Sequence, residues 1–309
     1  TGFLLHTIMQ GEIPAFVFHG FGHNIFYWKE KGYKKMELAL LKWIQSFSSP
    51  FLDGLFQLIT MLGEQWAVVL ALALSYWVID KNMGEEFAFT LLISGLCNNI
   101  LKGVFRFERP IGQEGIRTLR AHTATGYSFP SGHSQNAATL YFFPARRRGG
   151  WRWAAAGAVS LLVGLSRLYL GVHYPKDVAV GLALGIAAVF VCPFLWNRFH
   201  HEKMLAIMTA ACFLPTLLLG QRDLYKAFGL LAGFWAGMMF ERRFVGFSNQ
   251  VSKEKKVLRL LLGLPLLGGV QFLLKLLFPP LLWLDAARYA LLVFVALGLY
   301  PMIFHRAGF

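Results

Sequence analysis

Apolar runs alternate with short charged loops along the chain from about residue 65 onward. None shows the two-residue alternation of a half-buried strand, and most approach the roughly 20 residues that a helix needs to cross a bilayer. A spanning segment must satisfy its backbone hydrogen bonds within itself, so the pattern predicts an all-α fold, a polytopic transmembrane helical bundle. The expected helices are 66–79, 85–105, 133–144, 151–172, 175–196, 204–219, 224–240, 257–278 and 286–304.

The first 65 residues follow a different pattern. Residues 1–35 are rich in Gly, His and aromatic side chains and show no helical or strand period. We expect either a tag or over-extended reading frame ahead of a natural start at Met36, or an N-terminal arm. A signal peptide is not expected, because no basic start precedes an apolar core. Residues 36–65 predict interfacial or short helices, with 40–48 at the membrane interface and a break at Pro50.

Composition favours a membrane protein. Of the 309 residues, 56% are hydrophobic and 15% charged, and the mean hydropathy is +0.50, which is too apolar for an ordinary soluble domain. The net charge is +14, with the cationic residues in short loops between apolar runs. We therefore expect the bilayer and anionic lipid as partners, and no nucleic acid. The three cysteines lack close Cys or His neighbours, which predicts packing roles rather than disulfides or a zinc site.

Three short polar boxes interrupt the apolar pattern between residues 101 and 177. Arg offers a planar fork of donors, Lys a point charge and helix-start amides a positive field, so such a set suits a tetrahedral oxyanion. Of two histidines, one can attack phosphorus while the other protonates the departing oxygen, without any metal. The box residues are Lys102, Arg109 and Pro110; then Pro130, Ser131, Gly132 and His133; then Ser166, Arg167, His173 and Asp177.

Each box also has a purely structural interpretation. Ser131 is a typical helix cap, and Asp177, two residues after Pro175, is a typical helix-start carboxylate. Arg167 lies in an apolar run, where a charge usually marks function unless it snorkels from a helix end. The four-residue spacing from His173 to Asp177 permits a hydrogen bond that fixes the imidazole tautomer. Because all three boxes occur together, we favour the functional interpretation.

The three boxes closely resemble the signature boxes of the type 2 phosphatidic acid phosphatase (PAP2) superfamily of membrane lipid phosphatases, with every fixed position filled. The resemblance spans about residues 66–196. It implies a PAP2-like catalytic bundle over 66–202 and additional C-terminal transmembrane helices over 203–309. The roles it implies are His173 as nucleophile, Asp177 as its orienting carboxylate, His133 as general acid, and Lys102, Arg109, Ser131, Gly132 and Arg167 as phosphate ligands.

The same resemblance implies an activity. It is the metal-independent hydrolysis of a lipid phosphate or pyrophosphate through a phosphohistidine, with no cofactor. Undecaprenyl pyrophosphate and phosphatidylglycerol phosphate are among the candidate substrates.

Charged loops predict the orientation of the bundle. By the positive-inside rule, the two dense basic clusters, within 146–148 and 242–259, face the cytoplasm. One helix leads from His133 to the first cluster and the next returns to His173, so both histidines lie at the opposite end. The helix that carries Lys102 ends on the same side. We therefore expect an active site at the extracytoplasmic face of the cell membrane.

Several features leave alternatives open. Glu64 either contacts the active site or is a helix-start carboxylate, and residues 111–127 are either a substrate lid or a solvated connection. Residues 203–309 either enlarge the bundle or form a homo-oligomer surface. The boxes also occur in soluble vanadium haloperoxidases, and a transport or catalytically silent lipid-binding protein is a third class; the membrane pattern and intact histidines argue against both. A separation beyond about 10 Å between His173 and Arg109 would contradict the whole scheme.

Overall fold

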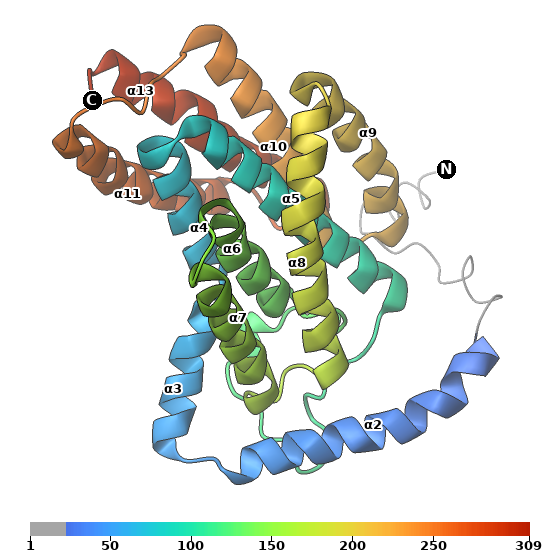
Figure 1. Cartoon of the computed structure of the whole chain (residues 1–309). Coiled ribbons are helices and arrows are strands. Elements are labelled where there is room, and N and C mark those ends of the chain that lie inside the picture. The colour runs from blue at the N-terminus through green and yellow to red at the C-terminus, as the bar shows by residue number, and fades with distance from the viewer. Residues whose placement is uncertain (1–22) are drawn as a thin grey trace, which may run out of the picture. The chain divides into compact units, whose positions relative to one another are not determined.

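The described chain is built from helices and the loops between them (Figure 1). The structure, a computed structural model, describes the backbone of residues 23–309 and the side chains of residues 34–309. Over residues 23–309 it contains no β-strand, so the all-α prediction is confirmed. The chain divides into two compact units: the first unit holds the described part of Glu12–Ala67 and Leu101–Ala187, and the second unit holds Val68–Ile100 and Ala188–Phe309.

Each unit has its own helices, and three helices run along the chain from one unit into the other. The first unit contains α2 (His23–Ser46), α3 (Pro50–Met61), the 3₁₀ turn η3 (Ala121–Thr123), α6 (Gly132–Arg148) and α7 (Arg152–Tyr169). The second contains the π-helical turns η2 (Leu74–Ile79) and η4 (Val295–Leu299) with α9 (His201–Leu219), α10 (Arg222–Phe244), α11 (Lys253–Leu277), α12 (Leu282–Phe294) and α13 (Tyr300–Arg306). The shared helices are α4 (Gln65–Ala73), α5 (Lys81–Phe105) and α8 (Pro175–Arg198).

Five of the described helical segments are long and apolar enough to cross a membrane. They are α5, α8, α9, α11 and the continuous segment from α12 through α13. A sixth arises if α3 and the α4–η2 segment, which meet at a bend of 42°, form one broken span. The polytopic membrane fold is therefore confirmed.

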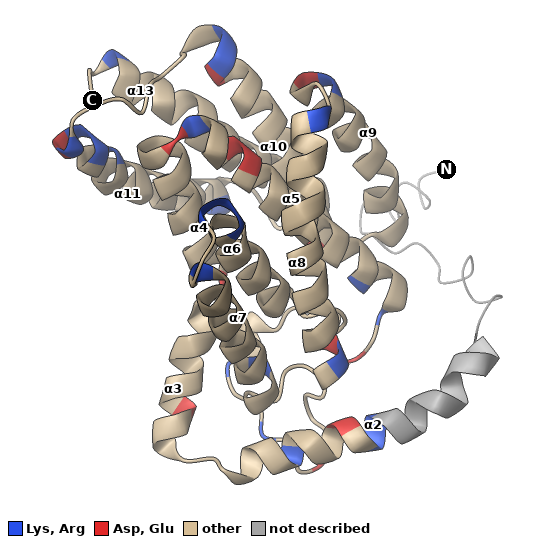
Figure 2. Ribbon diagram, viewed as in Figure 1, with Lys and Arg blue, Asp and Glu red and all other residues tan. Residues whose placement is uncertain are grey.

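All nine expected helices are present, with ends shifted by a few residues. The shifts mostly lengthen the helices, because charged residues beyond each apolar run are good helix formers. Thus α6 continues through Arg148 and α10 through Arg243, past the apolar positions that predicted them. Figure 2 shows the basic turn after α6 at the end of the α6–α7 hairpin away from the loops that carry the boxes.

The N-terminal segment differs from the expectation. Helix α2 begins at His23, upstream of Met36. Residues 23–35 are therefore helical, although their sequence shows no helical period. A nucleated helix extends at little cost into neighbouring residues, which explains the difference. Residues 1–22 lie outside the described chain, and the expectation of a tag, frame extension or arm stays a prediction. Along α2, Leu41 is buried while Trp43 is 61% exposed, as suits an interfacial helix.

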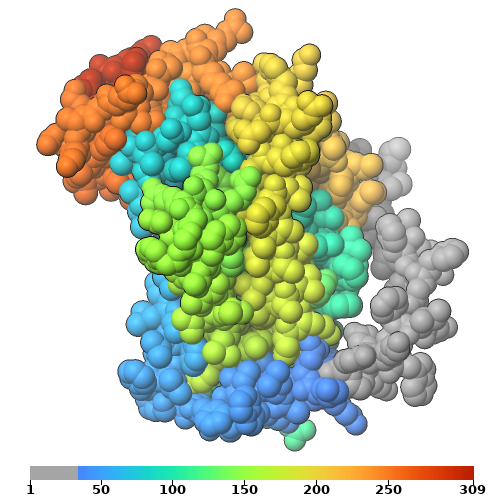
Figure 3. All heavy atoms as spheres, in the orientation of Figure 1, coloured from blue at the N-terminus to red at the C-terminus, as the bar shows by residue number. Residues whose placement is uncertain are grey.

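Within the first unit, α6 and α7 pack as an antiparallel pair, and α7 also contacts α2 and α3. Figure 3 shows α2 and α3, in blue, against the green of this pair. Glycine permits the close approach of α8 to the start of α6: a Cβ on Gly181 would lie 2.5 Å from the Ser131 carbonyl oxygen. The amide of Ser131 donates to the Asp177 carbonyl at 2.9 Å. This packing joins the second box to the third.

The second unit is organised around α10, which packs on α9, α12 and η4. Three ionisable side chains beyond residue 203 are buried: Glu241, Arg259 and Asp285 are at most 3% exposed. Burial is tolerated because each is paired. Glu241 accepts from Lys81 at 3.0 Å, Asp285 from Arg288 at 2.7 Å, and Arg259 donates to backbone carbonyls. These contacts have the character of a structural network.

Candidate active site

The three boxes meet within the first unit. Arg109, from the first box, places Nη1 2.9 Å from Nε2 of His173 in the third box. That distance is far inside the 10 Å limit set from the sequence. Ser131 of the second box is tied to Asp177 through the backbone, as described above. Segments distant in sequence thus form one buried polar cluster at the loop end of α6 and α7.

The tautomer of His173 follows from its neighbours. A guanidinium only donates, so Nε2 of His173 accepts from Arg109 and carries the ring's lone pair. The proton therefore sits on Nδ1, which faces Oδ2 of Asp177 at 3.3 Å. This arrangement leaves Nε2 as the ring nitrogen with a lone pair, which becomes free when Arg109 turns to another acceptor.

Asp177 is held by two groups besides His173. Its Oδ2 accepts from the Tyr174 amide at 2.9 Å and from the Ser128 hydroxyl at 2.5 Å. Ser128 is fully buried and also lies 3.4 Å from Nδ1 of His173. Sequence reasoning missed Ser128, and its only signal was its position two residues before Pro130 of the second box.

The surroundings of His173 favour its neutral form. Burial, followed by the cations Arg109, Arg167 and Lys102, holds its pKa well below the ordinary 6.5. A nucleophilic imidazole must be neutral, so activity that depends on such a role of His173 would be complete above pH 6.5 and lost only as the pH falls through its lowered pKa.

We expect the acid limb of kcat/KM that belongs to His173 to lie below about pH 6.5 and to rise in Lys102→Met, which removes one cation. The measurement is kcat/KM for a short-chain lipid phosphate between pH 4 and 9. Ionisation of the substrate also produces an acid limb in kcat/KM, but Lys102→Met does not shift the pH of that limb. An acid limb that does not move would contradict the electrostatic role of Lys102.

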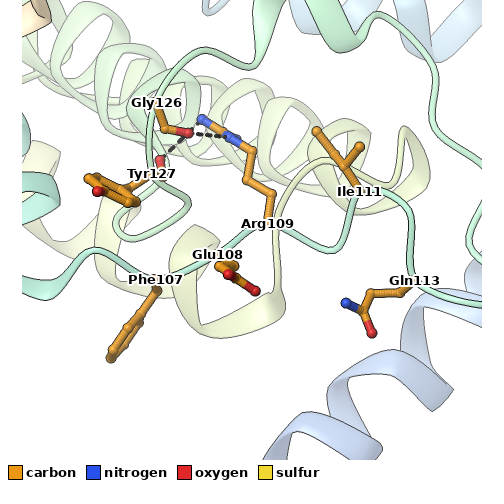
Figure 4. A pocket seen from close by; sticks show the side chains of 7 residues that line it. All are labelled: Phe107, Glu108, Arg109, Ile111, Gln113, Gly126 and Tyr127. Atoms are coloured by element: carbon orange, nitrogen blue, oxygen red, sulfur yellow. Dashed lines mark hydrogen bonds between the residues drawn. The ribbon is translucent and has the colours of Figure 1, made fainter.

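Arg109 and Lys102 order the loop that leads into the second box. Arg109 donates to the carbonyls of Thr125 at 2.7 Å, Gly126 at 2.9 Å and Val172 at 2.9 Å. Figure 4 shows its guanidinium pointing at the Gly126 and Tyr127 carbonyls. Lys102 Nζ donates to the Tyr127 carbonyl at 2.5 Å. Both predicted phosphate ligands therefore lie in the cluster and bond backbone carbonyls.

Arg167 is the box residue with spare donors. It is fully buried on α7, and Nη1 donates to the Thr60 hydroxyl of α3 at 2.8 Å. Within residues 34–309, no group accepts from its Nε or Nη2. A buried donor without an acceptor costs about 1–3 kcal/mol, so its retention fits an anion ligand. Thr60 carried no signal in the sequence, because only the packing of α3 on α7 brings it here.

We expect Arg167→Lys to lower kcat/KM by roughly 10²- to 10³-fold, because an ammonium cannot reproduce the planar fork and still reach Thr60. The matched control is Arg106→Lys, the same change at an exposed position just after α5, where the Arg106 Nε donates to the Gly103 carbonyl in the last turn of that helix. For each variant, the rate of phosphate release is measured at saturating and at limiting substrate concentrations. Equal loss in the two variants would mean that the effect is not specific to the cluster.

The second box stands at the start of α6. Ser131 caps the helix: its Oγ accepts from the Ser134 amide at 3.4 Å and from the Ser134 hydroxyl at 3.0 Å. The structural role weighed for Ser131 is therefore present, and Gly132 opens the helix beside it, with helix-start amides that favour an anion. His133 follows in the first turn, and its Nε2 is buried with no hydrogen-bond partner within residues 34–309.

The loop 111–127 is attached rather than free. Arg117 pairs with Asp53 of α3 at 2.7 Å, and this pairing raises the pKa of Arg117. Gln45 of α2 donates to the Arg117 carbonyl at 2.7 Å. Beside the loop is a pocket of about 400 Å³, drawn in Figure 4. Its lining residues are Phe107, Glu108, Arg109, Ile111, Gln113, Gly126 and Tyr127.

Comparisons of the chain with family models and with known proteins point to one family. The PAP2 superfamily model matches residues 86–201, and the model of the PAP2 superfamily phosphatase transmembrane extension matches residues 225–309. The chain is 31% identical over 154 residues to the undecaprenyl-diphosphatase of Sulfolobus acidocaldarius, covering 48% of this chain and 72% of that protein.

A longer alignment is shared with a eukaryotic protein. The chain is 28% identical over 264 residues to the probable sphingosine-1-phosphate phosphatase of Dictyostelium discoideum, covering 74% of this chain and 62% of that protein. The crystal structure of a transmembrane PAP2 type phosphatidylglycerolphosphate phosphatase from Bacillus subtilis aligns at 25% identity with a TM-score of 0.47, over 55% of this chain and 88% of that one.

A helical membrane fold that gathers two histidines, an aspartate and several cations defines a class of integral membrane proteins with an oxyanion site. The chain belongs to the PAP2 superfamily. The resemblance read from the boxes is confirmed.

Proposed function

We propose that this chain is a membrane lipid phosphatase that cleaves a phosphate monoester or pyrophosphate bond of a lipid through a phosphohistidine. The observation that carries the proposal is the placement of Nε2 of His173 against Arg109, with Nδ1 facing Asp177. This is an oriented neutral nucleophile beside an anion-binding cation. Relatives named as phosphatases of undecaprenyl diphosphate and of sphingosine 1-phosphate support the substrate class.

In the first step, the lone pair of Nε2 of His173 attacks phosphorus and the bond to the leaving oxygen breaks. His133 donates its proton to that oxygen, so that the lipid alcohol or lipid phosphate leaves without excess charge. Arg109 exchanges its hydrogen bond to His173 for one to a phosphate oxygen. Arg167 directs its two unpaired buried donors at the same group, and Lys102 adds charge stabilisation.

In the second step, a water molecule attacks phosphorus and the N–P bond breaks. His133, now neutral, accepts the proton of the water, and His173 recovers its lone pair. The negative charge of Asp177 stabilises the ring while its Nε2 is phosphorylated. The enzyme is regenerated and inorganic phosphate is released, without any redox change.

We also propose that the reaction takes place at the extracytoplasmic face. The supporting observation is that the basic turn at the end of α6 and the boxes lie at opposite ends of the α6–α7 hairpin (Figure 2). The use of residues 203–309 as a homo-oligomer surface stays a prediction. The exposed face of α11, with Phe272 71% exposed, is equally suited to lipid.

The test is phosphate release by the detergent-solubilised protein from a panel of lipid mono- and pyrophosphates, with and without a chelator. We expect release that the chelator does not reduce, and a rank order that names the substrate. A protein that releases none of these phosphates, or that oxidises halide when vanadate is added, would contradict the proposal. Reaction in sealed vesicles of known orientation tests the sidedness.

A further inference from the structure

The turn between α3 and α4 places a carboxylate beside His133. Oε1 of Glu64 lies 4.0 Å from Nε2 of His133 and 2.7 Å from Nη2 of Arg120. At 4.0 Å the carboxylate is too far to hold the imidazole proton in a hydrogen bond, yet close enough for a strong charge interaction. A proton carried by Nε2 of His133 would therefore be free to pass to a substrate oxygen.

The turn that carries Glu64 is fixed on α6. Tyr141 of α6 donates its hydroxyl to the Leu62 carbonyl at 3.1 Å. A Cβ on Gly63 would lie 2.7 Å from the His133 carbonyl oxygen, so the backbone of the turn is in close contact with the backbone of His133 itself. The distance from Glu64 to His133 is thus set by backbone packing as well as by side-chain torsions.

The backbone of Arg120 adopts an unusual conformation that positions its side chain. Its φ of 53° lies in the left-handed region, which an L-residue other than glycine seldom adopts. Its carbonyl accepts from the Thr123 amide at 3.0 Å and from the Thr123 hydroxyl at 2.9 Å, and these bonds hold the strained backbone. In this conformation the Arg120 side chain reaches Glu64 instead of extending into solvent.

The charges that face His133 are mostly positive. Glu64 contributes the carboxylate at 4.0 Å, whereas Asp177 pairs with His173 instead. Burial, followed by the cations around the ring, holds the pKa of His133 well below the ordinary 6.5, so an imidazolium at 133 needs a nearby anion to persist until it gives up its proton. The cations are Lys102 on α5, Arg109 and Arg120 in the loops and Arg167 on α7, with the ring of His173 as a further neighbour.

We propose that Glu64 is a positioning residue that opposes the surrounding cations and favours the protonated form of His133, the form that acts as general acid, and that Arg120 limits this effect by sharing the same carboxylate oxygen. The inference rests on the proposed phosphatase function. It predicts opposite results for the two partners of one ion pair. Loss of Glu64 makes His133 give up its proton at lower pH, whereas loss of Arg120 removes a cation and frees Glu64, so that His133 keeps its proton to higher pH.

The experiment measures two quantities in the full-length, detergent-solubilised protein. One is the pH titration of the His133 ring by NMR with isotope-labelled histidine, assigned with His133→Gln. The other is the basic limb of kcat for a short-chain phosphatidic acid. We expect Glu64→Gln to move both down by about one pH unit, Glu64→Asp to restore part of the shift, and Arg120→Gln to move both up.

The matched control is Asp53→Asn, which breaks an ion pair of the same 2.7 Å length in the same unit, between Asp53 and Arg117. We expect it to leave both quantities at the parental pH. A ring titration unchanged in Glu64→Gln, or shifted in the same direction in Glu64→Gln and Arg120→Gln, would overturn the inference. A parent protein without phosphate release would overturn the proposed function instead, while the ring titration still decides the role of Glu64.

Discussion

His173→Ala is expected to reduce phosphate release by at least about 10⁴-fold, because the variant lacks the nitrogen that attacks phosphorus in the proposed mechanism. The remaining cations still bind the lipid phosphate, so substrate affinity should change far less than kcat. Two measurements check this: steady-state release, and trapping of labelled phosphoprotein after an alkaline quench. The label should be present in the parent and missing in the variant.

The matched control is His122→Ala, which removes an exposed imidazole from the same unit, in the η3 turn. It should keep parental turnover and parental labelling. Labelled phosphoprotein in His173→Ala would show that another residue is the nucleophile.

Asp177→Asn is expected to lower kcat by roughly 10³- to 10⁴-fold, with a fold that stays intact. In the parent protein, Oδ2 of Asp177 accepts from the Ser128 hydroxyl and the Tyr174 amide and faces Nδ1–H of His173. An amide at this position presents N–H donors, which favours moving the ring proton to Nε2. In that tautomer the lone pair lies on Nδ1, so Nε2 cannot attack in the proposed mechanism, and the carboxylate charge proposed to stabilise the phosphorylated ring is gone.

The control for this second prediction is Asp80→Asn, at an exposed helix start where Oδ1 accepts from the Met83 amide at 2.7 Å. Such a carboxylate contributes about 1 kcal/mol or less to stability, so this variant should show a small loss in thermal unfolding and parental turnover. If Asp177→Asn behaved in the same way, Asp177 would be only a helix-start residue.

Sequence patterns predicted the helices better than they predicted the site's supporting residues. Apolar runs of membrane length predict helices because burial in lipid constrains a long stretch at once. The ends were displaced because capping and charged residues act locally, as at α6, where Arg148 extends the helix. Ser128 and Thr60 were missed because a serine or threonine in a loop or an apolar run is common, and its partner is visible only in three dimensions.

The tertiary structure also changed the interpretation of two residues weighed from sequence. Ser131 is a helix cap that bonds Ser134, and its place beside a phosphate stays a prediction. Glu64 does precede α4, as the structural interpretation held, and it also pairs with Arg120 near His133. A residue at a helix start can therefore serve both roles, because backbone position and side-chain contacts are set by different neighbours.

The sequence by itself determined that this chain is an all-helical membrane protein with three polar boxes suited to a phosphate, because hydrophobic period and residue chemistry are local properties. Only the tertiary structure decided which atoms meet: Arg109 with Nε2 of His173, Ser128 with Asp177, and Arg167 with Thr60. Each of these contacts joins segments that are distant along the chain or carry no local signal. Their geometry follows from helix packing, which residue spacing alone does not specify.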